Sequence, residues 1–228
     1  NNVVPGNVSL SNIDDDSHGF YISALNGQVS EPNNAATFTV ALTSQPTSNV
    51  TLGISSNDTT EGTVSTSSLV FTSTNWSTPQ TVTITAANDA LVDGDQNFYV
   101  VTAAATSSDS NYNGLNPADI AVTKLDDDSP GITVTTASND VSESGTTATI
   151  NVRLNSSPSS SVSIGISSSD TTEGTVSPST LNFNSTNWSI YQTITVTGID
   201  DALADGDQVF TIVTAAASSA DGNYNNRN

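Results

Sequence analysis

The stretch QTVTITAANDALVDGDQNF, residues 80–98, returns as QTITVTGIDDALADGDQVF, residues 192–210, at an offset of 112 positions. Each copy begins with apolar residues at every second position and continues into a loop rich in Asp and Gly. An Asp triplet recurs at the same offset, at residues 14–16 and 126–128. A constant offset without insertions indicates two copies of one structural unit.

Both copies place apolar, mostly β-branched residues at alternate positions among Ser, Thr and Asn. This period of two, interrupted by Gly, Asn, Ser and Pro, is typical of strands that bury one face. We expect strands in the first copy near residues 19–25, 35–43, 49–56, 68–72, 80–87, 96–105 and 117–125, and in the second near residues 131–137, 147–155, 161–168, 180–184, 192–199 and 208–217. About seven strands in about 110 residues is typical of an immunoglobulin-like sandwich, so we predict an all-β chain of two tandem sandwiches.

The chain carries 23 acidic residues against three Lys and Arg, which gives a net charge of −20. So few cations cannot form a basic patch, which argues against nucleic acid or an anionic membrane surface as a partner. No apolar run approaches the roughly 18 residues of a membrane span, so no membrane insertion is expected. Cys and Met are absent, which excludes disulfides and suits an extracellular, secreted protein. Because the sequence begins at Asn1, we interpret it as a processed or excised segment without its signal peptide.

The two copies are out of phase with the ends of the sequence. Residues 1–13 align with residues 113–125, which contain the last expected strand of the first copy. The second copy stops at Asn228, just before its own last strand would begin. The aligned pairs are Pro5 with Pro117, Val8 with Ile120, Leu10 with Val122, and Ile13 with Leu125. The sequence therefore starts with a spare last strand and ends one strand short.

A sandwich without its last strand has unpaired backbone groups at a sheet edge and unburied apolar surface. We expect residues 1–13 to fill this gap in the next molecule, which makes a head-to-tail homopolymer that does not close and grows as a filament. The predicted domains are then 1–13 as the donor strand, 14–128 as the first sandwich and 129–228 as the second, incomplete sandwich. Two alternatives stay open: a segment of a covalent array of repeats, such as an adhesin stalk, and a flexible tail at residues 1–13.

Carboxylates gather in the expected loops at equivalent positions of both copies. Ca²⁺ takes about six to eight oxygen ligands, and carboxylates are the hard ligands that it prefers. Asp and Gly also make good turns, but a turn does not require three consecutive acids in both copies. In an immunoglobulin-like sandwich, the loop before the sixth strand and the end of the seventh can meet at one pole, and we predict Ca²⁺ there. The acids are Glu31, Asp58, Glu61, Asp89, Asp93, Asp95 and Asp126–Asp128 in the first copy, and Glu143, Asp170, Glu173, Asp200, Asp201, Asp205 and Asp207 in the second.

At these residues the chain resembles the Calx-β family, known from the sodium–calcium exchanger and from tandem repeats of bacterial surface proteins. The resemblance covers each repeat nearly end to end and rests on the order of three stretches. They are VSESGTTATINVRL at Val141, QTVTITAANDALVDGDQNF at Gln80 and ADIAVTKLDDD at Ala118. The resemblance implies an immunoglobulin-like sandwich with a Ca²⁺ cluster at one pole.

Carried over by position, the resemblance implicates one set of calcium ligands in each sandwich. The family usually has Glu where Asp93 and Asp205 stand, so these two side chains are shorter than the family pattern. With strand donation, Asp14, Asp15 and Asp16 of the neighbouring molecule would complete the second set. The implicated residues are Glu31, Asp89, Asp93, Asp126, Asp127 and Asp128 in the first sandwich, and Glu143, Asp201 and Asp205 in the second.

Trp76 and Trp188 hold equivalent positions and leave a carbohydrate-binding module as a further function class. The single His18, without Cys or a recurrent Ser neighbour, gives no nucleophilic triad, so no enzyme is expected. The function we predict is the structural subunit of an extracellular bacterial filament, assembled by strand donation and stiffened by Ca²⁺ at domain junctions. The covalent adhesin stalk is the alternative, and the sequence does not indicate any glycan or other target.

Overall fold

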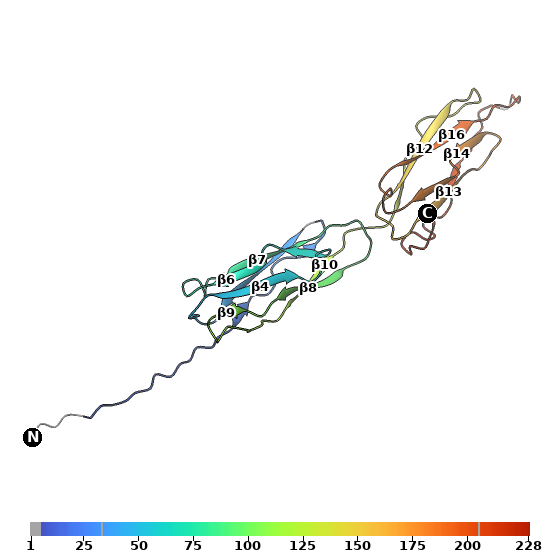
Figure 1. Ribbon diagram of the computed structural model, residues 1–228. Coiled ribbons are helices and arrows are strands. Elements are labelled where there is room, and N and C mark those ends of the chain that lie inside the picture. The colour runs from blue at the N-terminus through green and yellow to red at the C-terminus, as the bar shows by residue number, and fades with distance from the viewer. Residues whose placement is uncertain (1–5, 33, 205) are drawn as a thin grey trace, which may run out of the picture. The chain divides into compact units, whose positions relative to one another are not determined.

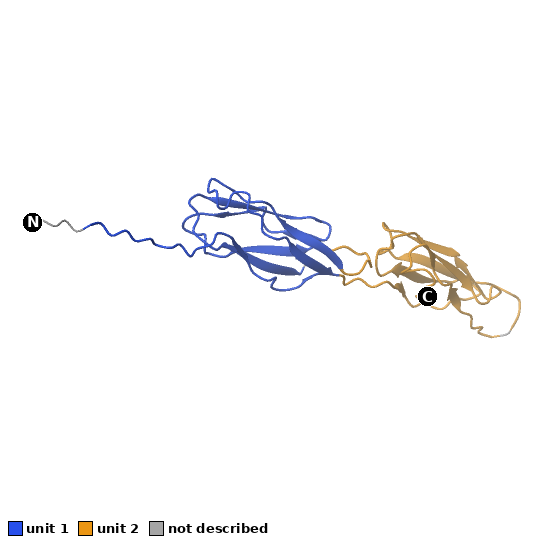
Figure 2. Ribbon diagram, turned by 90° about the horizontal axis from the view of Figure 1, so that it is seen from below, with its two compact units in different colours: residues 1–87, 96–125 blue, residues 88–95, 126–228 orange. Residues whose placement is uncertain are grey.

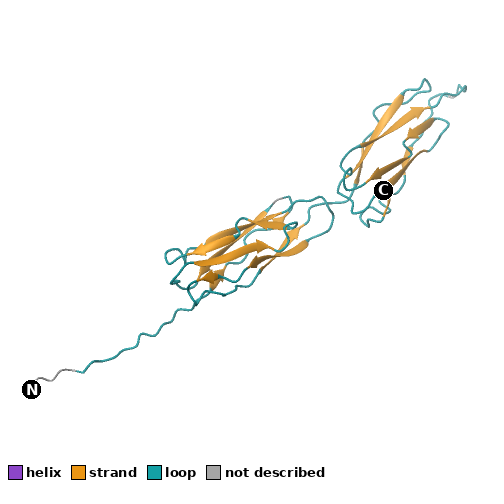
Figure 3. Cartoon of the chain, in the orientation of Figure 1, coloured by secondary structure: helices purple, strands orange, loops and turns teal. Residues whose placement is uncertain are grey.

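The computed structural model describes residues 6–32, 34–204 and 206–228, and Figure 1 colours them from the N-terminus to the C-terminus. These residues form strands, turns and loops, with no helix among them (Figure 3). The described chain accordingly contains no helix of the length and hydropathy needed to cross a membrane. The predicted all-β fold class is confirmed.

The chain divides into two compact units, shown in separate colours in Figure 2. Unit 1 comprises residues 1–87 and 96–125, and unit 2 comprises residues 88–95 and 126–228. The segment 88–95 belongs to unit 2 because its backbone bonds to residues there. The amide of Ser157 donates to the carbonyl of Ala90 (2.7 Å), and the side-chain amide of Asn223 donates to the carbonyl of Val92 (2.9 Å).

Unit 1 is a sandwich of two sheets. Its strands are β1 (Phe20–Ile22), β2 (Val29–Ser30), β3 (Ala35–Leu42), β4 (Val50–Ser56), β5 (Gly62–Val64), β6 (Ser68–Phe71), β7 (Gln80–Ala86), β8 (Gln96–Thr102), β9 (Thr106–Ser107) and β10 (Ile120–Leu125). One sheet has the order β1-β3-β7-β5, and the other has the order β2-β10-β8-β4-β6 with β9 also paired to β4. The pairs are antiparallel except for β2 with β10, which is parallel.

The core of unit 1 is made by the inward-facing residues of the two sheets. Val82 and Ile84 of β7 are fully buried, and so are Phe98 and Val100 of β8. Their polar neighbours in the sequence, such as Asn97, face away from the core. The predicted alternation is therefore confirmed, whereas the short strands β2, β5 and β9 were missed by the sequence prediction.

Unit 2 repeats one sheet fully and the other only in part. Its strands are β11 (Ile132–Val134), β12 (Thr147–Leu154), β13 (Val162–Ser168), β14 (Gly174–Ser177), β15 (Thr180–Phe183), β16 (Gln192–Gly198), β17 (Ile212–Thr214) and β18 (Ser218–Ser219). The complete sheet has the order β11-β12-β16-β14. The partial sheet has the order β15-β13-β17, with β18 also paired to β13.

The described residues of unit 2 contain no equivalent of β2 or β10, and the neighbouring strand is shortened as a result. In unit 1, β8 spans seven residues, and the five from Gln96 to Val100 pair with β10. In unit 2, β17 spans only three residues, all of which pair with β13. The strand predicted at 208–217 was therefore too long, because residues 208–211 have no partner strand beside them.

The described part of the predicted donor strand belongs to no sheet of either unit. Residues 6–13 form no strand, and Val8, Leu10 and Ile13 are 84%, 92% and 86% exposed. Pro5 lies outside the described residues. Donation of this segment to a neighbouring molecule stays a prediction.

A hydrogen-bonded corner closes the end of each sandwich. The hydroxyl of Tyr112 donates to the carbonyl of Ser44 (2.7 Å), and the Asp109 carboxylate accepts from the amides of Thr47 (2.8 Å) and Asn111 (3.0 Å). The two backbone amides hold the pKa of Asp109 below its usual range, since they bond best to the ionised carboxylate. Tyr224 and Asp221 repeat these contacts in unit 2.

We predict that Asp109→Asn lowers the free energy of unfolding of unit 1 more at pH 7 than at pH 3. Because the folded-state pKa is depressed, the carboxylate contributes its full stability above its unfolded pKa of about 4 and loses it as the pH falls through the folded value. Denaturant unfolding followed by Trp76 fluorescence in a Trp188→Phe background measures unit 1 alone. An equal loss at both pH values would contradict the prediction, and Asp15→Asn, an exposed substitution in unit 1, is the control.

Candidate metal centre

The parallel pairing of β2 and β10 brings two acidic segments together. Lys124 lies opposite Val29 and Leu125 lies opposite Ser30, so Glu31 and Asp126 are the next residues along the two strands. The amide of Glu31 donates to the carbonyl of Leu125 (3.1 Å), which extends the pairing by one bond. The pairing of β2 with β10 therefore places Glu31 beside the acidic residues that follow β10 in the sequence.

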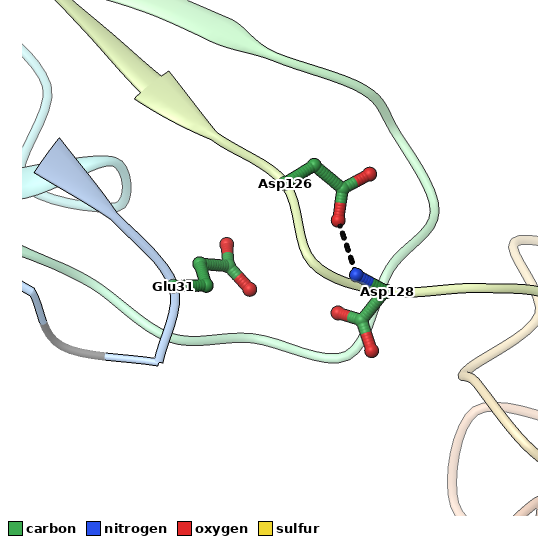
Figure 4. A group of neighbouring side chains, drawn as sticks. All are labelled: Glu31, Asp126 and Asp128. Carbon is green, nitrogen blue, oxygen red and sulfur yellow. Dashed lines mark hydrogen bonds between the residues drawn. The ribbon is translucent and has the colours of Figure 1, made fainter. Parts of the chain in front are cut away.

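Glu31, Asp126 and Asp128 form a compact group of carboxylates (Figure 4). Each residue offers one oxygen, and these oxygens lie within 4.8 Å of one another. Glu31 is buried and the two Asp residues are half-buried. The amide of Asp128 donates to a carboxylate oxygen of Asp126 (2.8 Å), which holds the turn that presents both side chains.

The Glu31 carboxylate has one buried oxygen without a hydrogen bond. The Glu31 Oε1 atom lies 2.5 Å from the Lys124 ammonium, whereas its Oε2 atom is buried and has no hydrogen-bond partner. An unsatisfied buried carboxylate oxygen is unfavourable because it has lost its water without replacement. A cation held by Glu31, Asp126 and Asp128 would satisfy this atom and reduce the repulsion among the three acids, and an all-carboxylate set fits a hard cation such as Ca²⁺.

The loop before β8 contacts the same residues through its backbone and side chains. The amide of Gly94 donates to the Asp126 Oδ2 atom (2.8 Å), and the amide of Asp126 donates to the Asp95 Oδ1 atom (3.2 Å). Asp89 instead accepts the amide of Leu91 within the loop (2.8 Å), and Asp93 is exposed.

The structure thus unites three of the six ligands expected in the first sandwich, Glu31, Asp126 and Asp128. Asp89, Asp93 and Asp127 are not in the group, and their role in binding stays a prediction.

The ligands expected for the second sandwich do not come together in the part of the chain that the structure describes. Glu143 and Asp201 are exposed, and Asp201 accepts the amide of Leu203 in its own loop (2.7 Å). Asp205 lies outside the described residues. Asp14, Asp15 and Asp16 are exposed as well. This second site also stays a prediction, since it was expected to need a neighbouring molecule.

Asp58 and Asp170 serve the turns rather than the group. The Asp58 Oδ1 atom accepts the hydroxyl of Thr60 (2.5 Å) and its amide (3.0 Å), and Asp170 repeats both bonds with Thr172. The Thr hydroxyl, followed by the Thr amide, lowers the pKa of each carboxyl below its usual range. These two acids therefore stay ionised as turn formers.

Trp76 and Trp188 are half-buried and pack against the cores of their sandwiches. Their rings contribute to packing, which weakens the case for an exposed sugar-stacking platform at these positions.

Lys124 forms a buried ion triad that sequence analysis missed. Its ammonium is fully buried and lies 2.5 Å from Glu31 and 2.8 Å from Glu61. The signal was present, because the chain's one Lys stands at an inward position of an alternating strand, two residues after the buried Val122. The triad spans the sandwich, since Lys124 belongs to β10 in one sheet and Glu61 directly precedes β5 in the other.

We predict that Lys124→Met destabilises unit 1 by about 3–5 kcal/mol, because it leaves two carboxylates without their buried cation. The measurement is denaturant unfolding in excess chelator, followed by Trp76 fluorescence in the Trp188→Phe background. Ala121→Met, on the exposed side of the same strand, is the matched control and should change stability by less than about 0.5 kcal/mol. Equal effects of the two substitutions would show that the triad does not stabilise unit 1.

Several solved structures are similar to this chain. The crystal structure of CBD12 from CALX1.2 is 16% identical, with 86% of this chain and 79% of that chain covered and a TM-score of 0.38. The calcium binding domain CBD12 of CALX1.1 is 17% identical, with 89% and 81% covered and a TM-score of 0.40. The YadV chaperone is 11% identical, with 89% and 97% covered and a TM-score of 0.35.

No curated protein matches the chain significantly in sequence. The family comparison is decisive instead, because the model of the Calx-beta domain matches residues 14–128 and again residues 126–226. These two matches cover nearly the whole sequence and coincide with the two sequence repeats. The chain therefore belongs to the Calx-beta domain family, with two domains in tandem.

Proposed function

We propose that this chain is a non-catalytic structural subunit of an extracellular filament, in which each molecule completes the second sandwich of the next. The donated segment is residues 1–13, here named the arm. Ca²⁺ binds the acids at the end of β10 and stiffens that end of the domain. The observation that carries the proposal is an open groove in unit 2 with both apolar and polar lining residues, at the position that β10 fills in unit 1.

This acceptor groove has a volume of about 900 Å³. Its apolar lining residues include Ile150, Val196, Phe210 and Ile212, and its polar lining residues include Glu143 and Glu173. Unit 1 provides an internal reference, because the same positions there are covered. Phe98, the equivalent of Phe210, is 1% exposed, and Val100, the equivalent of Ile212, is 0% exposed. Phe210 and Ile212 are both only half-buried.

In unit 1 the strand that covers Phe98 and Val100 is β10. Its contacts show which side chains a strand bound in the acceptor groove of unit 2 must have. Ile120 pairs with Val100, and Val122 pairs with Phe98. The inward-facing positions of β10 are Ile120, Val122 and Lys124, while Ala121 and Thr123 are exposed. An occupant of the acceptor groove therefore needs apolar residues two positions apart.

The arm has this pattern. By the repeat, Val8 aligns with Ile120 and Leu10 with Val122, and both arm residues are almost fully exposed in the chain. Burying two such side chains contributes about 1.5–3 kcal/mol each.

The arm also matches a polar contact of unit 1, where the Asp119 carboxylate accepts the amide of Thr102 (2.9 Å). Asn7 aligns with Asp119 and carries an amide oxygen that can accept the same bond from Thr214, the equivalent of Thr102.

A head-to-tail contact between an arm and an acceptor groove uses two different surfaces of the molecule. Such an interface does not close on itself, so repetition builds a linear assembly. The backbone bonds of strand addition supply affinity, and the apolar side chains supply specificity. The alternative is a covalent stalk, in which a strand that follows Asn228 in a longer chain fills the same groove.

Calcium binding is supported by the family and by the acids themselves. Glu31, Asp126 and Asp128 would hold the ion, and the buried Glu31 Oε2 atom, which has no hydrogen bond, would be one of its ligand atoms. The ion would supply positive charge where three carboxylates meet, and no chemical step depends on it. Asp128 also begins the connection to β11, so an ion bound there would restrict the backbone at that point.

Assembly tests the arm directly. We predict that Val8→Asp with Leu10→Asp abolishes filaments and leaves monomers, because two negative charges would be buried against Phe210 and Ile212 in a groove that already has acidic lining residues. Ser9→Asp with Ser11→Asp is the matched control: it adds the same charge at positions that align with the exposed Ala121 and Thr123 and should leave filaments intact. Electron microscopy and light scattering give the readout. Wild-type protein that stays monomeric at every concentration would reject donation and favour the covalent stalk.

Calcium titration tests the ion site. We predict that Asp128→Asn weakens Ca²⁺ binding by on the order of tenfold or more, because affinity depends on the number of charged ligands. The measurement is isothermal titration calorimetry on chelator-treated protein. Asp140→Asn removes the same charge at an exposed position outside the group and should bind Ca²⁺ like the wild type. Equal affinities of the two variants would place the ion elsewhere.

A further inference from the structure

The arm and β10 share the pattern of apolar residues two positions apart. At one inward-facing position, however, β10 has a charged residue and the arm has a neutral one. Val8 and Leu10 of the arm are apolar, like the residues of β10 with which they align. The third inward position is Lys124 in β10, and Asn12 aligns with it in the arm. Two similar strands in one chain pose a problem of selection, because each could pair with β8 of unit 1.

Lys124 provides what unit 1 requires at this position. Glu31 and Glu61 both point at its ammonium, at 2.5 Å and 2.8 Å, and the Glu31 side chain is only 2% exposed. An arm that took the place of β10 would bring the neutral amide of Asn12 between these two carboxylates. Buried carboxylates without a cation are strongly unfavourable, so the arm is a poor occupant of unit 1.

Unit 2 presents a different environment at the equivalent position. Glu143 aligns with Glu31 but is exposed, so its carboxylate remains in contact with water. Glu173, the equivalent of Glu61, is half-buried and lines the groove. An occupant of the acceptor groove therefore faces one exposed and one half-buried carboxylate, whereas an occupant of unit 1 faces the buried Glu31 and the half-buried Glu61. Asn12 is tolerated there, since a hydrated carboxylate does not depend on a buried cation.

The order of the arm and β10 along the sequence makes this selection necessary. The arm precedes β1, whereas β10 is the last strand of unit 1 in sequence. The arm is therefore synthesised before its competitor and is close to the unfilled sandwich while that sandwich forms. Its two apolar residues match those of β10, so hydrophobic burial does not separate the two strands.

We infer that Lys124 is the residue that selects β10 over the arm for unit 1, and that Asn12 keeps the arm available for the acceptor groove of a second copy. This inference rests on the proposed function, because it specifies how the donated strand reaches the correct sandwich. Lys124 acts as a specificity determinant through its ion pairs with Glu31 and Glu61.

Disulfide trapping can read which sandwich the arm occupies, because the chain has no Cys of its own. Ala121 pairs with Tyr99 in unit 1, and Ser9 aligns with Ala121. Ser9→Cys combined with Tyr99→Cys therefore reports an arm in unit 1. Ser9→Cys combined with Thr211→Cys reports an arm in unit 2, since Thr211 aligns with Tyr99. Directly opposed strand residues lie within disulfide reach.

The full chain is oxidised with diamide, and the two disulfides are quantified by mass spectrometry. With the native Asn12 and Lys124, we expect the disulfide to residue 211 between molecules and little disulfide to residue 99. Asn12→Lys should raise the ratio of the residue-99 product to the residue-211 product by at least about tenfold, since β10 and the arm then offer unit 1 the same cation. Lys124→Asn, added to Asn12→Lys, should raise the ratio further.

Ser11→Lys adds the same charge at the position that aligns with the exposed Thr123, and it should leave the ratio unchanged. Asn12→Lys leaves every residue of unit 1 beyond the arm unaltered, so its result does not depend on a destabilised sandwich.

The outcomes separate the two proposals. If the residue-211 disulfide forms and Asn12→Lys does not change the ratio, the selection is wrong and donation stands. If the residue-211 disulfide never forms but Asn12→Lys produces the residue-99 disulfide, donation and the role of Asn12 in it are wrong, whereas the selection of β10 by Lys124 in unit 1 stands. If neither disulfide forms in any variant, both are wrong.

Discussion

The pairing of β10 with β8 is the interaction on which unit 1 depends. It completes one sheet, covers Phe98 and Val100, and carries Lys124 into the core. It also sets the position of the acids that follow, because Asp126 directly continues the strand. The described residues of unit 2 repeat the sequence pattern without this strand, and there residues 208–211 are not part of a strand. A single strand thus decides whether a sandwich of this sequence has a closed core and a group of acids at its end.

The open groove of unit 2 is preformed rather than collapsed. A Cβ atom added at Gly174 would come within 2.2 Å of the Phe210 ring. A Cβ atom added at Gly62 would likewise come within 2.5 Å of the Phe98 ring, so the two rings occupy equivalent places. Absence of the covering strand therefore leaves this aromatic ring in its place. An occupant that finds its contacts already arranged avoids the cost of ordering them, which favours strand addition over rearrangement of the sandwich.

The sequence predicted the long strands well, because period-two patterns of β-branched residues report local burial. It failed where structure depends on a distant partner. Residues 208–217 have the pattern of a full strand, but only Ile212–Thr214 have a partner strand. The acids Glu31, Asp126 and Asp128 could be anticipated from their positions, whereas the ion triad could not, because Lys124 meets Glu61 only when two sheets stack. Short strands such as β5 were missed because three residues carry too little periodicity.

Glu31 links the register of β10 to the cation group, because its two oxygens serve different neighbours. The Oε1 atom binds Lys124, and the buried Oε2 atom remains available to a cation shared with Asp126 and Asp128. A slip of β10 by one residue would turn Lys124 to solvent and shift both Asp residues away from Glu31, since alternate residues face opposite sides of a strand. A buried ion pair is weak evidence for stability alone. Here its value lies in register, because the correct pairing is the one that satisfies the lysine and assembles the acids together.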